Sequence, residues 1–296
     1  MRGLIVKALS GFYTVESEGE RYVCRARGIF RKKGQSPFAG DTVEFTPAPD
    51  EESEGTVDKI IPRTNLLTRP PLANVSRLLI VSSVKAPVPN ITLIDKLTAI
   101  ACDKGITPAV VFNKSDLDDG SGLCSIYEKA GISGMVISCA TGEGKDRLRE
   151  FINAGGITVL TGNSGVGKSS ILNALYPRLD LPTGEISEKL GRGRHTTRHV
   201  ELFKCGGGGY IADTPGFSSM ETWRGEVISK ENLPLAFPEF ASYLGKCRFV
   251  SCSHREEKGC AVREAVQSGD IAESRYRSYL AMYDEVKDMN DWGKKR

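Results

Sequence analysis

Short segments rich in β-branched and aromatic residues fill about the first sixty positions, and Gly, Pro or acidic turns separate them. Segments of this kind predict short β-strands. Five strands in so short a stretch predict a small barrel, for which an OB-fold is the most economical choice. We expect this N-terminal β-barrel to span residues 1–62. The predicted strands are residues 4–9, 12–17, 22–28, 41–47 and 55–61.

Strands and helices alternate in the pattern of the next part of the chain. A proline-rich segment, residues 61–74, predicts a linker, and the apolar segment 77–84 predicts a buried strand. Residues 91–105 carry apolar side chains on one helical face, with Asn90 as the expected N-cap. The alternation predicts a mostly parallel α/β sheet whose ligand loops follow the carboxyl ends of its strands. Further strands are expected at 108–113, 134–140 and 157–160, with helices at 145–152 and 170–176.

The last part of the chain, residues 223–296, is expected to be a small and largely helical domain. From about Asp270 onward the pattern predicts an amphipathic helix with a mixed-charge face, used for packing. The predicted fold class is therefore α/β, with a central domain of residues 63–222 between the barrel and this C-terminal domain.

The composition, with 40% hydrophobic and 26% charged residues, is ordinary for a soluble globular protein. A net charge of +3 limits any nucleic-acid contact to local basic patches. No apolar segment is long enough to cross a membrane, and the N-terminus lacks the features of a signal peptide. Five of the eight cysteines are scattered singly, as expected for reduced thiols in a cytoplasmic protein. We expect a monomer, because the pattern shows no spare apolar surface.

A glycine-rich segment, GNSGVGKSS, matches the pattern G-x-x-x-x-G-K-[ST] between a predicted strand and a predicted helix. Backbone N–H groups of such a loop surround phosphate oxygens, and the helix that follows presents its positive end. Lys168 would contact the β- and γ-phosphates, and the Ser169 hydroxyl would bind Mg²⁺. The predicted phosphate-binding residues are Gly162, Asn163, Ser164, Gly165, Val166, Gly167, Lys168, Ser169 and Ser170.

A tetrapeptide after an apolar strand, NKSD, predicts specificity for guanine. The Asp116 carboxylate can accept hydrogen bonds from the ring N–H and the exocyclic amine of guanine, a donor pair that adenine lacks. Asn113 can bond the base edge, and the stem of Lys114 can lie over the base. The predicted ligand is therefore GTP or GDP. The guanine-binding residues are expected to be Asn113, Lys114, Ser115 and Asp116, with Ser138, Cys139 and Ala140 in a second loop whose N–H at Ala140 meets the O6 oxygen.

The segment GYIADTPG predicts a strand that ends in a D-x-x-G element. Asp213 would hold Mg²⁺ through water, and the Gly216 N–H would contact the γ-phosphate. Before this element, residues 184–202 are rich in glycine and charge and predict a mobile loop. Within that loop Thr196 or Thr197 would close over Mg²⁺ and the γ-phosphate, and Thr197 is preferred.

The order of these elements is the reverse of that in Ras-like GTPases, because the guanine-reading elements come before the phosphate-reading ones. It predicts a circularly permuted domain. Phe217 stands where Ras-like enzymes have the glutamine that orients the attacking water. His195, in the basic loop, is the candidate for that catalytic role. The alternative is a histidine that contacts phosphate or lies on the surface.

Basic residues interleave with two aromatic residues, Tyr22 and Phe30, in the predicted barrel. This mixture suits contact with an RNA backbone and stacking on its bases. The alternative is a solvated, charged loop on a structural barrel. The basic residues are Arg21, Arg25, Arg27, Arg31, Lys32 and Lys33.

Three cysteines and one histidine lie close together in the C-terminal domain. Three thiolates and one imidazole make a tetrahedral Zn²⁺ site with no open position for water, so the site is expected to be structural. Metal would supply folding energy that a short polar segment lacks. The alternative is a group of incidental thiols. The predicted zinc ligands are Cys247, Cys252, His254 and Cys260.

Together these motifs resemble the RsgA (YjeQ/YloQ) family of circularly permuted GTPases. The motifs that carry the resemblance are the barrel, NKSD ahead of GNSGVGKSS, GRGRHTT, DTPGF and the C-terminal Cys/His cluster, which together cover essentially the whole chain. The resemblance implies GTP hydrolysis stimulated by the small ribosomal subunit, and a role in late maturation of that subunit. It also implies rRNA contact through the barrel and the zinc domain, and it supports His195 as the catalytic histidine.

Two other classes of function share some of these features. In a GTP-gated RNA-binding module, nucleotide would only order the basic loop, and hydrolysis would be incidental. A GTPase of tRNA modification or metal delivery would need a dimerisation domain or an exposed, incomplete metal site, and the sequence shows neither. The ribosome-stimulated GTPase and the GTP-gated module need the same binding residues, so only rates of hydrolysis separate these two classes.

Overall fold

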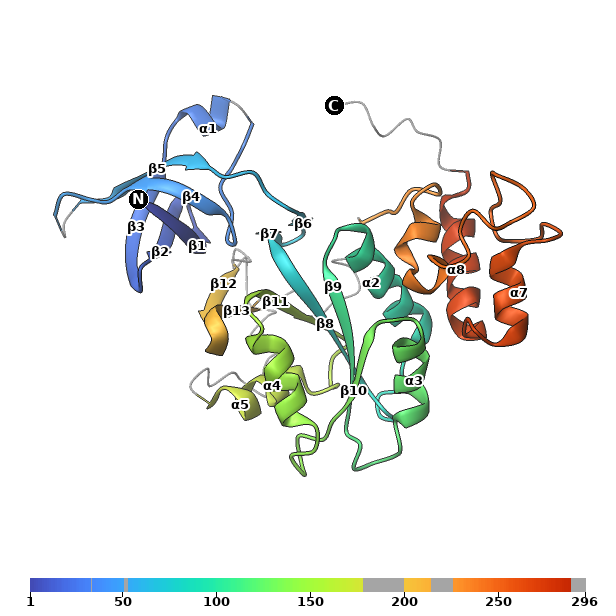
Figure 1. Cartoon of the computed structure of the whole chain (residues 1–296). Coiled ribbons are helices and arrows are strands. Elements are labelled where there is room, and N and C mark those ends of the chain that lie inside the picture. Colours follow the sequence, from blue (N-terminus) through green and yellow to red (C-terminus); the bar gives the residue numbers. More distant parts are fainter. Residues whose placement is uncertain (33, 51–52, 178–199, 214–225, 289–296) are drawn as a thin grey trace. The chain divides into compact units, whose positions relative to one another are not determined.

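The computed structural model describes residues 1–32, 34–50, 53–177, 200–213 and 226–288 (Figure 1). The chain divides into two compact units. Unit 1 comprises Met1–Leu78 and Asp146–Thr222, and unit 2 comprises Leu79–Lys145 and Trp223–Arg296. The domain boundaries at residues 62 and 222 that follow from the motifs stay a prediction.

The N-terminal strands of unit 1 form a closed barrel, which confirms the five strands expected there. The strand order of the barrel is β1-β2-β3-β5-β4. Strand β4 also pairs with β1, and this pairing closes the barrel. The strands are β1 (Arg2–Leu9), β2 (Phe12–Ser17), β3 (Glu20–Ala26), β4 (Thr42–Thr46) and β5 (Gly55–Ile60).

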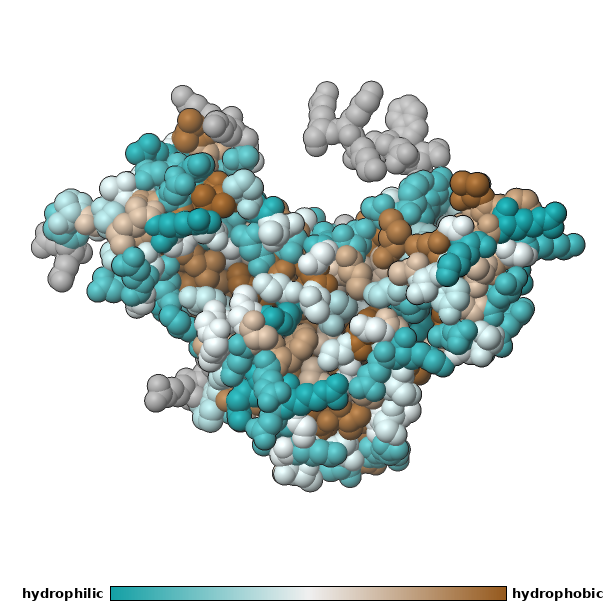
Figure 2. All heavy atoms as spheres, viewed as in Figure 1, coloured by the Kyte–Doolittle hydropathy of each residue, from teal (hydrophilic) through white to brown (hydrophobic). Residues whose placement is uncertain are grey.

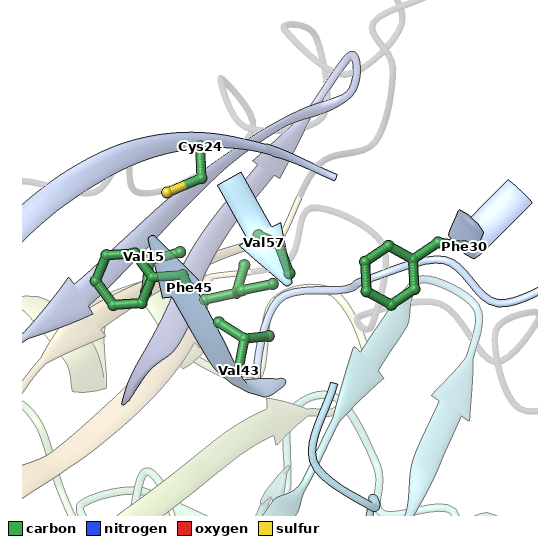
Figure 3. Packing of buried hydrophobic residues seen from close by; sticks show 7 residues of the cluster. Val15, Cys24, Phe30, Val43, Phe45 and Val57 are labelled. Carbon is green, nitrogen blue, oxygen red and sulfur yellow. The ribbon is translucent and has the colours of Figure 1, made fainter. Parts of the chain in front are cut away.

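The barrel interior is filled by alternate residues of its strands (Figure 3). Val15, Val43 and Phe45 are among its buried side chains, and the short helix α1 (Ile29–Lys32) adds Phe30, which is only 6% exposed. Burying a side chain of this size is worth roughly 1.5–3 kcal/mol. Phe30 is therefore a core residue, and the expectation that it takes part in base stacking is wrong.

The proline-rich segment after the barrel forms a small hairpin in place of the expected linker. Its strands are β6 (Leu66–Thr68) and β7 (Pro71–Ala73). Leu67 and Leu72 are buried, so the segment contributes to the core of unit 1. Gly40, with a φ of 86°, lets the backbone pass close to β7, because a Cβ there would lie 2.0 Å from the carbonyl oxygen of Ala73.

The barrel continues into the rest of unit 1 through its first strand. The strand order is β11-β13-β12-β1, in which β11 and β13 are parallel and β12 is antiparallel to both of its neighbours. Strand β12 was not predicted, since its first residues fall at the end of the segment expected to be a mobile loop. The elements are α4 (Lys145–Asn153), β11 (Gly156–Thr161), α5 (Lys168–Leu175), β12 (Glu201–Lys204) and β13 (Gly209–Asp213).

The first part of unit 2 (Leu79–Lys145) contains a parallel pair of strands, and its helices lie between successive strands in the chain, as the alternating pattern predicts. The order is β10-β9-β8, and β8 begins in unit 1. The side chain of Asn90 accepts a hydrogen bond from the Leu93 N–H at 3.0 Å, which confirms the predicted N-cap. The elements are β8 (Val75–Ser83), α2 (Ile91–Asp103), β9 (Thr107–Asn113), α3 (Ser121–Lys129) and β10 (Ser133–Val136).

The C-terminal part of unit 2 is helical, as expected. It comprises the 3₁₀ turns η4 (Leu233–Ala236) and η5 (Pro238–Phe240), then α7 (Ala261–Ser268) and α8 (Glu273–Val286). Helix α8 confirms the helix predicted from about Asp270. Within the described ranges, no helix has the length and apolar character needed to span a membrane.

A buried arginine joins α8 to α2 and η5. Arg275 is 0% exposed; its Nε donates to Glu239 at 2.7 Å, and its Nη1 donates to Asp95 at 2.9 Å and to Thr98 at 2.8 Å. The Ser278 hydroxyl donates to the second oxygen of Asp95 at 2.6 Å. Burial alone lowers the pKa of Arg275, but Glu239 and Asp95 offset burial and raise it above its ordinary value. The arginine is therefore a fixed cation in the core of unit 2.

Candidate nucleotide and metal sites

The phosphate loop of unit 1 lies between β11 and α5, the context that the motif requires. Gly165 and Gly167 have φ values of 77° and 96°, which glycine adopts without steric cost. Gly167 is the N-cap of α5, and Ile171, Leu172 and Leu175 form the buried face of that helix, as the spacing predicted. The glycines therefore turn the chain sharply into a helix N-terminus, where a phosphate group finds unpaired N–H donors.

The side chain of Lys168 folds back over this loop. Its Nζ donates to the carbonyl oxygens of Gly162 at 2.7 Å and Asn163 at 2.8 Å. Burial lowers the pKa of this amine to about 8. The residue that should contact the β- and γ-phosphates is thus held at the centre of the loop by two neutral carbonyls, which an anionic ligand can replace.

The guanine-type loop of unit 2 orients its aspartate through Ser138. The Ser138 hydroxyl donates to Asp116 Oδ1 at 2.5 Å, and Ser138 Oγ accepts from the backbone N–H groups of Ala140 and Thr141 at 3.2 Å each. Ser138 is fully buried, whereas Asp116 is exposed. Because a hydroxyl has a single proton to donate, these bonds fix the direction in which Ser138 holds the carboxylate.

The other predicted guanine residues lie in the same pair of loops. Asn113 Oδ1 accepts from the Cys139 N–H at 3.3 Å, and Lys114, in a left-handed conformation with a φ of 68°, donates through Nζ to the Ala86 carbonyl at 2.5 Å. The Ser115 hydroxyl donates to Glu143 at 2.5 Å. Glu143 was not predicted, and its only sequence signal is its place shortly after the second loop. The structure therefore brings all seven predicted guanine residues together within unit 2.

Asp213 is the last residue of β13, as predicted, and its backbone pairs with Glu201 of β12. Its strand runs parallel to β11, which leads into the phosphate loop. The other residues predicted for this site lie outside the described residues: His195, Thr196 or Thr197, and Gly216. Phe217, which stands in place of the Ras-like glutamine, lies outside them as well. Their roles stay predictions.

The predicted metal ligands converge within unit 2. Their donor atoms all lie within 4.8 Å of one another. The Nδ1 atom of His254 is 3.5 Å from the Sγ atoms of Cys247 and Cys260, which are 3.9 Å apart. Zn–S bonds of about 2.3 Å and a Zn–N bond of about 2.0 Å give tetrahedral edges of roughly 3.8 Å and 3.5 Å. The cluster of Cys247, Cys252, His254 and Cys260 can therefore hold a metal ion of this size.

A carboxylate holds the loop that carries the histidine. Glu257 accepts from the hydroxyl and N–H of Ser253, both at 2.6 Å, and from the Arg255 N–H at 2.8 Å. Burial alone raises the pKa of Glu257, but these hydrogen bonds more than offset it and lower the pKa to about 2. Sequence reasoning missed this residue, because a glutamate in a polar loop has no distinctive local signal.

Three of the basic side chains predicted for the barrel form ion pairs on its surface. Arg21 pairs with Glu16 at 3.5 Å, Arg27 pairs with Asp58 at 2.8 Å, and Arg25 pairs with Glu54. The Arg25 guanidinium also lies 4.3 Å from the ring centroid of Phe12, an exposed aromatic residue that was not predicted as part of the cluster. Figure 2 shows hydrophilic residues over much of the visible face of the barrel.

A phosphate loop, a guanine-type loop that precedes it in the chain, and a D-x-x-G strand end define a circularly permuted GTPase. Comparisons with known proteins agree. The family model described as RsgA GTPase matches residues 60–223, and the model of the RsgA N-terminal domain matches residues 2–57. The chain belongs to the RsgA GTPase family, which confirms the resemblance and the fold class.

Relatives and solved structures extend this similarity over the full chain. Proteins named small ribosomal subunit biogenesis GTPase RsgA are 46% identical in Geobacillus thermodenitrificans, over 97% of both chains, and 44% identical in Streptococcus pneumoniae, over 100% of this chain and 98% of the relative. The crystal structure of YjeQ from Thermotoga maritima has a TM-score of 0.81 at 37% identity, over 98% and 99% of the two chains. YloQ, described as a circularly permuted GTPase, has a TM-score of 0.78 at 35% identity, over 98% and 96%.

Proposed function

We propose that the chain binds GTP through two sets of residues, one for guanine and one for the phosphates, and hydrolyses it to GDP and phosphate. The observation that carries the guanine assignment is the hydrogen bond from Ser138 to Asp116. A carboxylate has about four acceptor sites, so Asp116 can accept from Ser138 and from both guanine donors at once. The Lys168 ammonium and the N-terminus of α5 support phosphate binding.

The same proposal assigns the Mg²⁺ that accompanies the nucleotide. The Ser169 hydroxyl, Asp213 through water, and Thr197 would hold it, and Gly216 would contact the γ-phosphate. These are the oxygen donors that Mg²⁺ prefers, and the ion would neutralise charge that develops on the phosphates during transfer.

The small ribosomal subunit is the partner that we propose, with the chain acting as a cytoplasmic monomer late in the maturation of that subunit. The names of the relatives support this assignment. Arg25 stacked on the exposed ring of Phe12 supports rRNA contact through the barrel, since an arginine–aromatic pair offers both charge and a stacking surface. Exposed Phe249 beside Arg248 offers a similar pair near the metal cluster.

Steady-state GTP hydrolysis with purified ribosomal subunits tests this function. We expect strong stimulation by small subunits and little by large subunits or bulk RNA at equal nucleotide concentration. Equal and slow rates in every reaction would contradict the proposal and favour a GTP-gated RNA-binding module.

Replacing His195 by Ala should reduce the stimulated kcat by roughly 10²–10⁴-fold, since a positioned acid–base or water-orienting group contributes this much. GTP affinity should stay within about twofold of the wild-type value, because the residue acts on water and not on the nucleotide. Stopped-flow binding and single-turnover hydrolysis measure the two separately. An unchanged turnover rate would remove His195 from the mechanism.

We further propose that the metal held by the Cys/His cluster is one structural Zn²⁺. Elemental analysis of the purified chain should give one zinc per molecule, and Cys252→Ser should lower this content. The free energy of unfolding should fall by about 4 kcal/mol or more, as expected on loss of a structural metal. Cys102→Ser, at a thiol outside the cluster, serves as the control. Full stability of the zinc-free chain would contradict a structural role.

A further inference from the structure

The hairpin of β12 and β13 lies between the phosphate-loop strand and the barrel of unit 1. On one side β13 pairs with β11, with Ala212 opposite Val159. On the other side β12 pairs with barrel strand β1, with Glu201 opposite Lys7. In the described sheet, the hairpin therefore lies between the barrel and β11, the strand that leads into the phosphate loop.

A single residue, Glu201, links the barrel to the strand end that carries Asp213. Lys7 Nζ forms an ion pair of 2.7 Å with Glu201, and Glu201 is the backbone partner of Asp213. A displacement of β1 would therefore be passed to the residue directly opposite the proposed Mg²⁺-binding aspartate.

A buried carboxylate of the barrel fastens both strands of the hairpin. Glu16, on β2, is only 8% exposed, and its Oε1 accepts from Lys204 Nζ at 2.8 Å and from the Tyr210 hydroxyl at 3.0 Å. Lys204 and Tyr210 face each other across the hairpin. Burial alone raises the pKa of Glu16, but hydrogen bonds from Lys204 and Tyr210 offset burial and lower it. One side chain thus holds β12 and β13 to the barrel at the same point.

The turn of the hairpin is fixed at the other end. Gly207 has a φ of 66°, and a Cβ there would lie 1.9 Å from the carbonyl oxygen of Asn153, so only glycine allows this approach. Asn153 Oδ1 accepts from the Tyr176 hydroxyl at 2.7 Å, and Tyr176 is the C-cap of α5, the helix of the phosphate loop. The hairpin is therefore anchored to the phosphate-loop helix at its turn and to the barrel at its strands.

We propose that Glu16 is a positioning residue for GTP hydrolysis: it couples engagement of the barrel by the ribosomal partner to the position of the β12–β13 hairpin and its terminal Asp213. The inference rests on the proposed function. Coupling requires a shared element that both sites bias, and the hairpin contacts both the barrel and the phosphate-loop elements. Misplacement of a catalytic element by about 1 Å can reduce a rate about 10²-fold, so a small shift is sufficient.

Point substitutions test the proposal better than deletion of the barrel, since deletion would expose the edge of β12. Glu16→Gln keeps the shape of the side chain and removes its charge, and Lys204→Met removes the ammonium donor. In each variant we expect the ratio of stimulated to unstimulated kcat to fall about tenfold. The KM for GTP and the affinity for small subunits in co-sedimentation should stay within about twofold of wild type. In the double variant, which carries Glu16→Gln and Lys204→Met, the ratio should fall no further than in the stronger single variant. Both changes break the same contact between Glu16 and Lys204.

Two further variants separate positioning from folding. Tyr210→Phe removes one hydrogen bond with little loss of packing and should give a smaller fall in the ratio. Glu44→Gln breaks the exposed Lys59–Glu44 pair on the same barrel and should keep full stimulation. The inference is overturned if Glu16→Gln keeps the wild-type ratio of stimulated to unstimulated kcat. It is also overturned if both rates fall by the same factor and the melting temperature of the variant falls as well, because that result indicates a loss of folded protein. If the wild-type chain itself shows no stimulation, the proposed function fails and the inference fails with it.

Discussion

Replacement of Arg275 by Ala should lower the free energy of unfolding by about 3–5 kcal/mol, the cost of breaking a buried ion pair from one side. The change leaves the carboxylates of Asp95 and Glu239 in the core of unit 2 without their cation. A buried charge that has lost its partner is costly, and this cost is the source of the expected loss. Chemical denaturation followed by far-UV circular dichroism measures the loss.

The same helix offers a matched control. Arg277 lies two residues further along α8, is 74% exposed, and pairs with Glu273 one turn away. Arg277→Ala should cost no more than about 0.5 kcal/mol, as for other exposed helix pairs. In a background of Glu239→Gln, Arg275→Ala should cost less than it does alone, since one of the stranded carboxylates is already neutral. A loss below about 1 kcal/mol for Arg275→Ala would mean that the network adds little to stability.

Arg275 also shows a feature that could not be predicted from the sequence, namely the partners of a buried charge. The pattern of α8 indicated an amphipathic helix with a mixed-charge face. Arg275 lies on the buried face of this helix, together with Tyr279 and Met282, whereas Arg277 lies on the opposite side. A charge can lie on the buried face because α2, 180 positions away in the chain, supplies Asp95, and the same helix supplies Thr98. Local periodicity identifies the face of a helix but not the partner that makes a buried charge tolerable.

The strands of the barrel were predictable because each one is marked by local alternation and by its own turns. Closure of the barrel through the β1–β4 pairing depends on residues far apart in the chain. The same limit explains the hairpin of β6 and β7, whose prolines indicated a linker. Burial of Leu67 and Leu72 depends on neighbours that a local pattern does not contain.

The candidate site residues could be named from the sequence because phosphate and guanine recognition require particular side chains at fixed spacings. Spacing identified Asp116 and Ser138 as members of two loops, but not the hydrogen bond between them. It likewise identified the four members of the Cys/His cluster but not Glu257, which holds their loop. Supporting contacts of this kind use common residues without fixed spacing, and only the folded chain shows them.

Replacement of Asp116 by Asn should change the base preference of the enzyme from guanine to xanthine. The Ser138 hydroxyl will continue to donate to Oδ1, because Ser138 Oγ already accepts from Ala140 and Thr141. The new amide group then replaces the second carboxylate oxygen and meets the base with an N–H donor. The exocyclic amine of guanine is also a donor, so it repels the amide N–H of the new asparagine. Xanthine has a carbonyl oxygen in place of this amine, and that oxygen can accept a hydrogen bond from the amide N–H. The ratio of kcat/KM for XTP over GTP should rise on the order of 10⁴-fold, as for other sites built on buried polar matching.

Two variants show whether orientation by Ser138 is the cause. Asp119→Asn changes an exposed carboxylate three positions further on, which bonds Ser121, and should leave the base preference unchanged. Ser138→Ala in the Asp116→Asn background should reduce the inversion, since the amide is then free to present either its oxygen or its nitrogen to the base. If Asp116→Asn still prefers GTP over XTP to within about tenfold of the wild-type ratio, this carboxylate does not read the base, and the guanine assignment must move to another residue.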